Sequence, residues 1–262
     1  MITDSEIAQF DELGAVTIDT PLTEAQVAAV SDTFDQLLPL VEPEDGTLPR
    51  FRVGMGNFFE QELLDIVQHP FFEDVAKKVL RADAVHFFQT VIITTYPTPN
   101  GQFSFDQHTD IQYSTSDLDA VPKRMICSYF LWISGVNKKR APLMYRPGSH
   151  RLIAAEREKN QDLRNAVPTV EGVKLAQLPQ LDYANAVPAT ARAGQVSVLT
   201  TGMVHGASVN VDTEPRKSMI ITFTTVGVEI GLPENQATNR LEYNRELKQR
   251  LRPERAHIVP DG

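Results

Sequence analysis

The sequence places a histidine two positions before an aspartate in the stretch FDQHTDIQY, residues 105–113. Residues two apart on a β-strand point to the same face, so His108 and Asp110 would present an imidazole and a carboxylate to one point. That arrangement suits two ligands of one metal ion. The spacing alone is a weak signal, because 6 histidines and 34 acidic residues in 262 positions produce such pairs by chance. A third ligand and a suitable scaffold are therefore required.

His205 is the candidate for the third ligand. In the segment TTGMVHGASVN it is expected to end a strand, followed by Gly206 and a turn into the next strand. Two histidines and a carboxylate leave three positions open on an octahedral ion, which suits non-haem Fe(II) oxygen chemistry. The same ligand set also binds catalytic zinc, so a zinc site is the alternative. The remaining histidines are expected to be structural or exposed: His69, His86, His150 and His257.

Arg216 supplies a cation close to the third candidate ligand. A hairpin that turns near Asn210 and Val211 would bring Arg216 roughly opposite His205. A guanidinium there could clamp the far carboxylate of a metal-bound keto acid through two parallel hydrogen bonds. The plain alternative is a surface arginine beside Glu214. The combination of this arginine with two histidines and an aspartate favours the clamp.

The elements that must position these residues are helices first and strands afterwards. TDSE at 3–6 and TEAQ at 23–26 are capping boxes that predict two helices, with GAVTI as a short strand between them. Helical spacing over 61–80 is interrupted at Pro70, which predicts two short helices joined there. Four later segments are rich in β-branched and aromatic residues and predict strands: 85–96, 125–134, 194–201 and 217–228. The stretch LPRFRVGMGNFF is expected to be a loop, and 155–190 a long, partly helical excursion.

Length and composition favour one domain that acts on a small molecule. The chain has 262 residues and 42% hydrophobic content, enough for a sizeable core. Its formal charge of -9 and pI near 5.2 argue against a nucleic-acid partner. The single cysteine, Cys127, cannot form an internal disulfide, and neither a signal peptide nor a membrane span is recognised. A soluble, cytoplasmic protein without a membrane partner is expected, and its oligomeric state stays open.

Several motifs occur in an order that is more specific than any one of them. They are the opening FDELGAVTIDTPLTEAQVAAV, the strand FFQTVIITTYP, the pair QHTD, the strand FLWIS, the turn PGSHR, and HGASVN followed by Arg216. Together they cover most of the chain. With this set the sequence resembles the phytanoyl-CoA dioxygenase family of Fe(II)- and 2-oxoglutarate-dependent oxygenases.

The resemblance implies a mainly β fold with flanking helices, built on a double-stranded β-helix, which is a cupin-like jelly roll. One oxygenase domain would span residues 1–262. It would comprise a mostly helical part at 1–82, the jelly-roll core at 83–230 and a C-terminal tail at 231–262.

The resemblance also assigns roles to individual residues. The iron ligands carry over to His108, Asp110 and His205, and the clamp for 2-oxoglutarate carries over to Arg216. The family often has a serine two residues after the second histidine, whereas this chain has Ala207 there and a serine next to it. The residues expected to line the cosubstrate pocket are Gln89, Trp132 and Ser208, although a buried strand tryptophan is equally often plain core.

The implied reaction uses Fe(II), 2-oxoglutarate and O2 to oxidise an unactivated C–H bond of a small metabolite, releasing succinate and CO2. Hydroxylation is favoured over halogenation, because related halogenases have a small residue at the position of Asp110. Two alternatives stay open: a non-catalytic jelly roll that binds a small ligand, and a cupin-like metalloenzyme that needs no keto acid and hence no Arg216 clamp. The residues proposed to contact the substrate are Arg50, Arg52, Asn57, Tyr113, Arg124 and Arg146.

Overall fold

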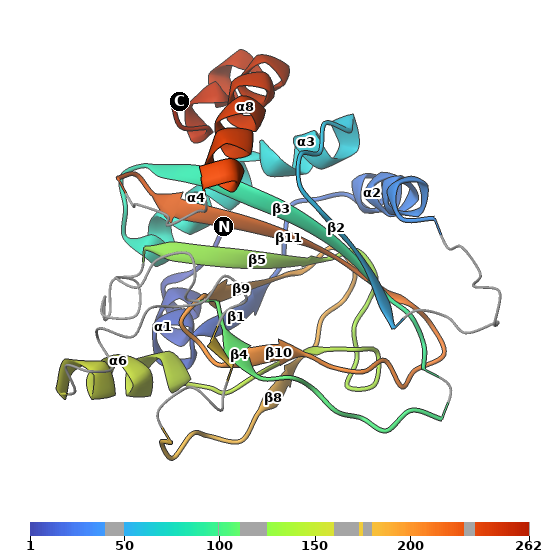
Figure 1. The fold of residues 1–262 in the computed structure, drawn as a ribbon, viewed down its shortest axis with the longest axis vertical. Coiled ribbons are helices and arrows are strands. Elements are labelled where there is room, and N and C mark those ends of the chain that lie inside the picture. The colour runs from blue at the N-terminus through green and yellow to red at the C-terminus, as the bar shows by residue number, and fades with distance from the viewer. Residues whose placement is uncertain are drawn as a thin grey trace.

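The computed structural model describes residues 1–39, 50–98, 100–110, 125–159, 173–174, 180–227 and 234–261 (Figure 1). Two antiparallel sheets face each other at its centre, and helices cover the outer side of the larger sheet. This is the jelly-roll core with flanking helices that the sequence predicts. None of the described helices is long and apolar enough to cross a membrane.

In the part of the chain that the structure describes, the two sheets contain six and five strands, and every paired neighbour runs antiparallel. The larger sheet has the order β1 (Ala15–Ile18), β9 (Val196–Thr200), β5 (Ile126–Trp132), β11 (Arg216–Thr225), β3 (Val85–Thr95) and β2 (Phe51–Met55). The smaller sheet has the order β7 (Val173–Lys174), β4 (His108–Thr109), β10 (His205–Ala207), β6 (Leu143–Tyr145) and β8 (Val187–Ala189).

The helices begin where the capping residues predict. Thr3 and Thr23 each accept a hydrogen bond from the backbone three residues on, and Glu6 and Gln26 reach back to complete two capping boxes. The break at Pro70 is also confirmed, because this proline occupies the first turn of its own helix. Among the described residues the helices are α1 (Asp4–Leu13), α2 (Glu24–Leu37), α3 (Gln61–Val67), α4 (Pro70–Leu80), α6 (Ser149–Lys159) and α8 (Glu234–Arg250), followed by the 3-10 helix η2 (Pro253–Ile258).

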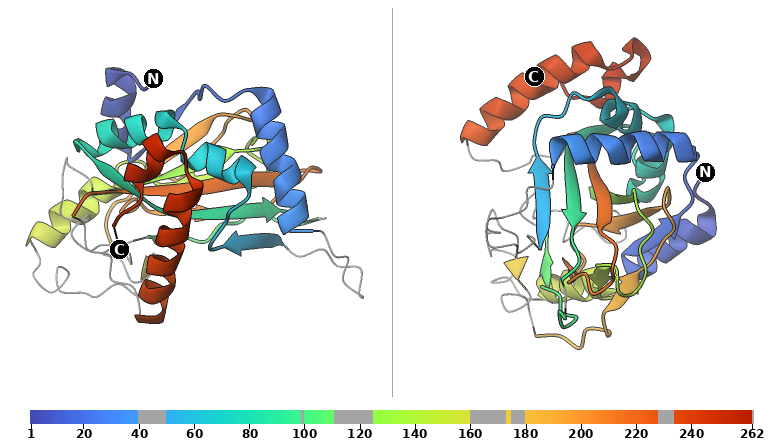
Figure 2. Two further views of the ribbon diagram at one scale, coloured as in Figure 1. Left: turned by 90° about the horizontal axis from the view of Figure 1, so that it is seen from above. Right: turned by 90° about the vertical axis from the view of Figure 1, so that its right-hand side faces the viewer.

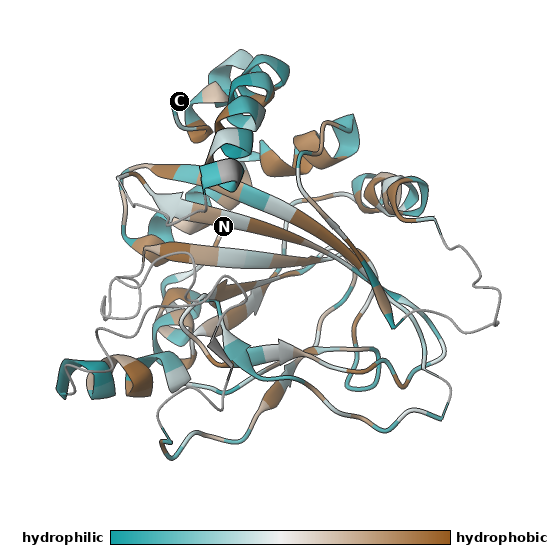
Figure 3. Ribbon diagram, viewed as in Figure 1, coloured by the Kyte–Doolittle hydropathy of each residue, from teal (hydrophilic) through white to brown (hydrophobic). Residues whose placement is uncertain are grey.

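The two faces of the larger sheet have different partners. On β11, Met219, Ile221 and Phe223 belong to the main core between sheet and helices. Because side chains alternate along a strand, Arg216 and Ser218 face the other way, toward the smaller sheet. Figure 3 shows the central strands as mainly apolar and α8 as mainly polar. A second, smaller apolar cluster fills part of the space between the sheets and includes Phe130, Trp132 and Leu143.

The expected hairpin between His205 and Arg216 is wrong. His205 begins β10, which pairs with β4 and β6, whereas Arg216 begins β11, which pairs with β3 and β5. The connection between them therefore crosses from one sheet to the other. The cross-strand partner of Arg216 is Thr95 on β3.

Two other segments differ from their expected form, and a third lies partly outside the described residues. The expected loop LPRFRVGMGNFF contains strand β2, which extends the larger sheet at its edge. The C-terminal segment folds as α8 and η2, whose Tyr243, Leu247 and Ile258 join the main core. Within 155–190, the end of α6 and strands β7 and β8 are described, while 160–172 and 175–179 lie outside the described residues.

Glu73 ties the C-terminal segment to helix α4. Its carboxylate is 3% exposed and pairs with Lys77 Nζ at 2.5 Å, Arg255 at 2.7 Å and His257 Nε2 at 3.0 Å. Burial alone would raise the pKa of this carboxyl, but the hydrogen bonds from Lys77 and His257 and the charge of Arg255 hold it at about 2. Folding therefore stabilises the ionised form of Glu73 relative to its protonated form.

Replacing this carboxylate should destabilise the fold in a pH-dependent way. Glu73→Gln should lower the free energy of unfolding at pH 7 by about 1–3 kcal/mol, because Lys77, Arg255 and His257 lose their charged acceptor. A depressed pKa stabilises above the unfolded value of 4.5 and ceases to do so as the pH falls toward about 2. Urea unfolding should therefore show the difference between wild type and variant shrinking below pH 4.5. The exposed neighbour gives the control, Asp74→Asn, and an equal loss in both variants would contradict this role.

Candidate metal centre

Three potential metal ligands meet where β4 lies beside β10. His108 and His205 are cross-strand partners, and their ring centroids are 4.6 Å apart. The Asp110 carboxylate lies between them, with one oxygen 3.5 Å from His108 Nε2 and the other 3.3 Å from His205 Nε2. One ligand atom from each residue lies within 4.8 Å of the other two. The backbone N–H of Asp110 donates to the carbonyl of Thr201 at 2.9 Å, which anchors the aspartate beside the end of β9.

The buried imidazole of His205 has a fixed orientation. Its Nδ1 lies 2.8 Å from the carbonyl oxygen of Met203. A ring nitrogen that donates its proton to a carbonyl leaves the other nitrogen with a free lone pair, so Nε2 is the atom available to a metal. His205 shares its face with Tyr145, whose ring packs on the apolar cluster between the sheets. The ligand atoms therefore point into the space between the two sheets.

The charge of the site is set by the carboxylate. Burial would raise the pKa of Asp110, but the charges and hydrogen bonds of His205 and His108 hold this pKa well below its usual range. Burial would lower the pKa of His205, but the charge of Asp110 raises it above its ordinary value. The side chains of His108 and Asp110 are 31% and 25% exposed, so the cluster is open to small molecules on one side.

Glycine at position 206 lets the two ligand strands approach each other. A Cβ at Gly206 would lie 1.4 Å from the carbonyl oxygen of Asp106 and 2.6 Å from its carbonyl carbon. Both atoms are backbone, so they cannot move aside without displacing the segment that leads into β4. Position 206, next to His205, therefore requires glycine, because the backbone just before His108 lies against it.

Arg216 is a buried cation that no carboxylate of the described residues neutralises. Its guanidinium donates to Ser218 Oγ at 2.6 Å and to Thr95 Oγ1 at 2.7 Å, and its carbon lies 5.7 Å from the ring centroid of Trp132. Its Nε has no partner, and no carboxylate of the described residues pairs with it. Burial lowers its pKa to about 10. Burying an unpaired charge is unfavourable, so this arrangement suits an anion that arrives with a ligand.

The three other residues expected to line the cosubstrate pocket, Trp132, Gln89 and Ser208, have different surroundings. Trp132 contacts Arg216 and donates from Nε1 to Ser197 Oγ at 2.9 Å, so it also belongs to the core. Gln89 is half-buried opposite Thr222 on the larger sheet. The Ser208 hydroxyl donates to the carbonyl of Pro142 at 2.6 Å and is committed to the protein.

The expected substrate contacts divide between the two sides of the sheets. Arg146 donates to the side-chain oxygen of Gln107 and to the carbonyl of Ala184. Arg52 donates to the carbonyl of Pro39 and lies on the helix side of β2. Asn57 is exposed after β2, and Arg50 pairs with Asp106 at 3.9 Å. Tyr113 and Arg124 lie outside the described residues.

Three of the four histidines outside the cluster have structural partners. His150 is buried, and its Nε2 lies 3.0 Å from the carbonyl of Asp11. His69 caps helix α4, and His257 pairs with Glu73.

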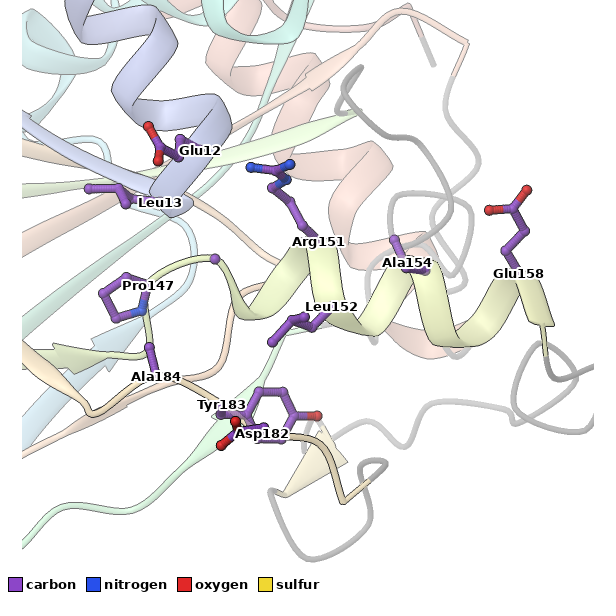
Figure 4. A pocket seen from close by; sticks show the side chains of 12 residues that line it. Glu12, Leu13, Pro147, Arg151, Leu152, Ala154, Glu158, Asp182, Tyr183 and Ala184 are labelled. Carbon is purple, nitrogen blue, oxygen red and sulfur yellow. The ribbon is translucent and has the colours of Figure 1, made fainter.

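A cavity of about 1030 Å³ lies next to helix α6 (Figure 4). It is lined by the end of α1, the turn at Pro147 and Gly148, one side of α6 and residues 182–184. Neither the three potential ligands nor Arg216 lines it, so its size does not mark it as the site of chemistry.

Comparison with protein families decides the identity. The family model of phytanoyl-CoA dioxygenase (PhyH) matches residues 10–218. The chain belongs to this family. It is accordingly a non-haem iron oxygenase that uses 2-oxoglutarate and O2. No curated protein matches the chain in sequence.

Solved structures with the same fold are distant in sequence. The epimerase SnoN in complex with Fe3+, alpha ketoglutarate and nogalamycin RO has 17% identity and a TM-score of 0.64, covering 85% of this chain and 83% of that one. EvdO2 from Micromonospora carbonacea var. aurantiaca, complexed with 2-oxoglutarate, has 18% identity and a TM-score of 0.64, covering 90% and 96%. EctD from S. alaskensis with bound Fe has 18% identity and a TM-score of 0.60, covering 88% and 80%.

The close approach at Gly206 can be tested by adding one methyl group. Gly206→Ala should separate β4 from β10 and abolish stoichiometric metal binding, because His108 and His205 lose their register. Gly135→Ala is the control, since a Cβ there meets nothing nearer than 3.9 Å. Metal content and thermal unfolding of both variants provide the measurement. Normal metal binding by the Gly206→Ala protein would contradict the constraint.

Proposed function

We propose that His108, Asp110 and His205 bind Fe(II) in this protein. The donor set supports the assignment, because two neutral imidazoles and one carboxylate on one side leave three positions free for other ligands. The hydrogen bond of His205 Nδ1 to Met203 supports it further, since it presents Nε2 to the ion. The low pKa of Asp110 keeps an anionic donor at neutral pH.

Arg216 is the residue proposed to hold the far carboxylate of 2-oxoglutarate. The single observation that carries this assignment is a buried guanidinium with an unpartnered Nε and no carboxylate partner among the described residues. Thr95 and Ser218 fix its orientation through its other nitrogens, and Trp132 supports it from the side. A carboxylate supplies the missing charge and accepts two hydrogen bonds in the plane of the guanidinium.

The reaction proposed is oxidation of an unactivated C–H bond of a small organic molecule, with hydroxylation as the default outcome. Bound iron with 2-oxoglutarate and O2 supplies the oxidant, and the keto acid leaves as succinate and CO2. The protein holds the reactants in a fixed geometry and limits the access of water. The apolar cluster around Phe130 and Trp132 provides a dry wall between the sheets.

Removing either histidine ligand should abolish iron binding and leave the fold intact. The jelly-roll core is made of apolar contacts that do not involve His108 or His205. His108→Ala and His205→Ala proteins, loaded anaerobically with Fe(II), should contain no stoichiometric iron and form no succinate. His150→Ala is the matched control, because that histidine is buried outside the cluster and should affect stability alone. A fully active His205→Ala protein would refute the assignment.

The role of Arg216 is tested by the dependence of turnover on 2-oxoglutarate concentration. Losing one partner of a desolvated charged pair typically costs about 2–5 kcal/mol, so Arg216→Ala should raise the half-saturating concentration roughly 30-fold or more. Arg216→Lys should fall between variant and wild type, because lysine offers one point charge in place of a planar fork.

Lys217→Ala is the matched control for Arg216. Lys217 is the next residue along β11 and pairs with Asp35 at 2.7 Å on the helix side of the sheet. Its half-saturating concentration should equal that of wild type. Succinate formation is the measurement, and an unchanged requirement in the Arg216→Ala protein would leave the keto-acid clamp unsupported.

A further inference from the structure

Strand β2 exposes a row of large apolar side chains. Phe51, Val53 and Met55 lie on one face of this strand and are 50%, 39% and 69% exposed. β2 is the edge strand of the larger sheet, as Figure 2 shows beside β3. These three residues are called the apolar row below.

The register of β2 on β3 shows which way the apolar row faces. Phe51 lies opposite Thr95, Val53 opposite Ile93 and Met55 opposite Val91. Directly opposed residues of an antiparallel pair point to the same face. Thr95 Oγ1 accepts a hydrogen bond from Arg216, so its side chain lies on the face that carries this arginine. The apolar row therefore faces the smaller sheet, on the same side as the proposed cosubstrate clamp.

The alternate residues of β2 point to the helix side. A Cβ added at Gly54 would meet the side chains of Ile92 and Phe58, and Ile92 belongs to the main core. Arg52 lies on this helix side as well. The charged residue of β2 is thus directed away from the space between the sheets, and the apolar residues are directed toward it.

The beginning of the apolar row lies beside the strand that carries the ligands. Arg50, the residue before Phe51, pairs with Asp106 at 3.9 Å, two positions before His108. On the same face, the neighbouring positions Val91, Ile93 and Ile220 extend the apolar surface across β3 and β11. The row therefore continues from the edge of the sheet toward the interior.

We propose that the apolar row binds an uncharged hydrocarbon part of the organic substrate. A contiguous exposed apolar surface is typical of a ligand-binding wall. The row is continuous with the face that carries Arg216. This inference rests on the proposed function and adds to it a substrate class with a hydrocarbon chain or ring face.

Neutral straight-chain alcohols serve as probes of this surface. Calorimetric titration of 1-hexanol and 1-octanol into protein loaded with Zn(II) and 2-oxoglutarate avoids turnover. Burial of a methylene group strengthens binding about fourfold, so octanol should bind about 15-fold more tightly than hexanol to wild type. In the double variant Val53→Asn with Met55→Gln, which keeps side-chain size, this ratio should fall below about threefold. Val226→Asn, at another exposed apolar position, should keep the wild-type ratio.

Each other outcome has a defined meaning. Wild type that binds metal and 2-oxoglutarate but shows no dependence on chain length, or a double variant with the wild-type ratio, overturns the inference and leaves the proposed function standing. Failure of wild type to bind metal or 2-oxoglutarate overturns both. Light scattering provides the last arm: a wild-type dimer that the double variant dissociates would show that β2 pairs with a second copy, and the substrate role would be wrong.

Discussion

The pairing of β4 with β10 is the contact on which the site depends. It places His108 opposite His205, and Asp110 follows directly, held to Thr201 by its backbone. Each strand is only two or three residues long, so neither could hold its histidine alone. Further pairing supports both strands, because β10 also pairs with β6 and β4 also pairs with β7. Gly206 allows the approach because no side chain separates the two backbones.

The charges between the two sheets fit a divalent metal ion bound together with a dianionic keto acid. Asp110, which follows β4 of the smaller sheet, and Arg216, on β11 of the larger sheet, carry opposite charges, and each is buried or half-buried. A divalent ion and a dianionic keto acid then balance each other between them. A keto-acid-independent enzyme would have no need of the buried guanidinium, and a non-catalytic binder would have no need of the three clustered potential metal ligands. Family membership and this charge pattern point to the same cosubstrate by independent routes.

Sequence reasoning succeeded where a local pattern determines a local structure. Capping boxes gave the starts of α1 and α2, Pro70 gave the break before α4, and apolar strand composition gave β3, β5, β9 and β11. It failed where sheet partners are distant in the chain. The sequence suggested a hairpin after His205, but β10 and β11 pair with strands of different sheets, and this choice depends on long-range packing.

Which residues of β2 face the space between the sheets also depends on strand pairing. Its charge makes Arg52 a candidate substrate contact, but the strand register directs it to the helix side. The same register directs Phe51, Val53 and Met55 toward the smaller sheet. A shift of one residue in that register would have reversed the result. The signal that could have revealed it was the alternation of apolar residues with arginine and glycine in FRVGM, which is a strand pattern inside an expected loop.

The most direct test of the account is the visible charge-transfer absorption that forms when a 2-oxo acid chelates Fe(II). Anaerobic protein is loaded with one equivalent of Fe(II), its spectrum is recorded, and 2-oxoglutarate is added before air is admitted. The account predicts an absorption band that appears with 2-oxoglutarate, saturates at one equivalent and decays in air as succinate forms. Fe(II)-loaded protein that gains no band and forms no succinate would contradict the central claim that the three ligands and Arg216 together bind the metal and the keto acid.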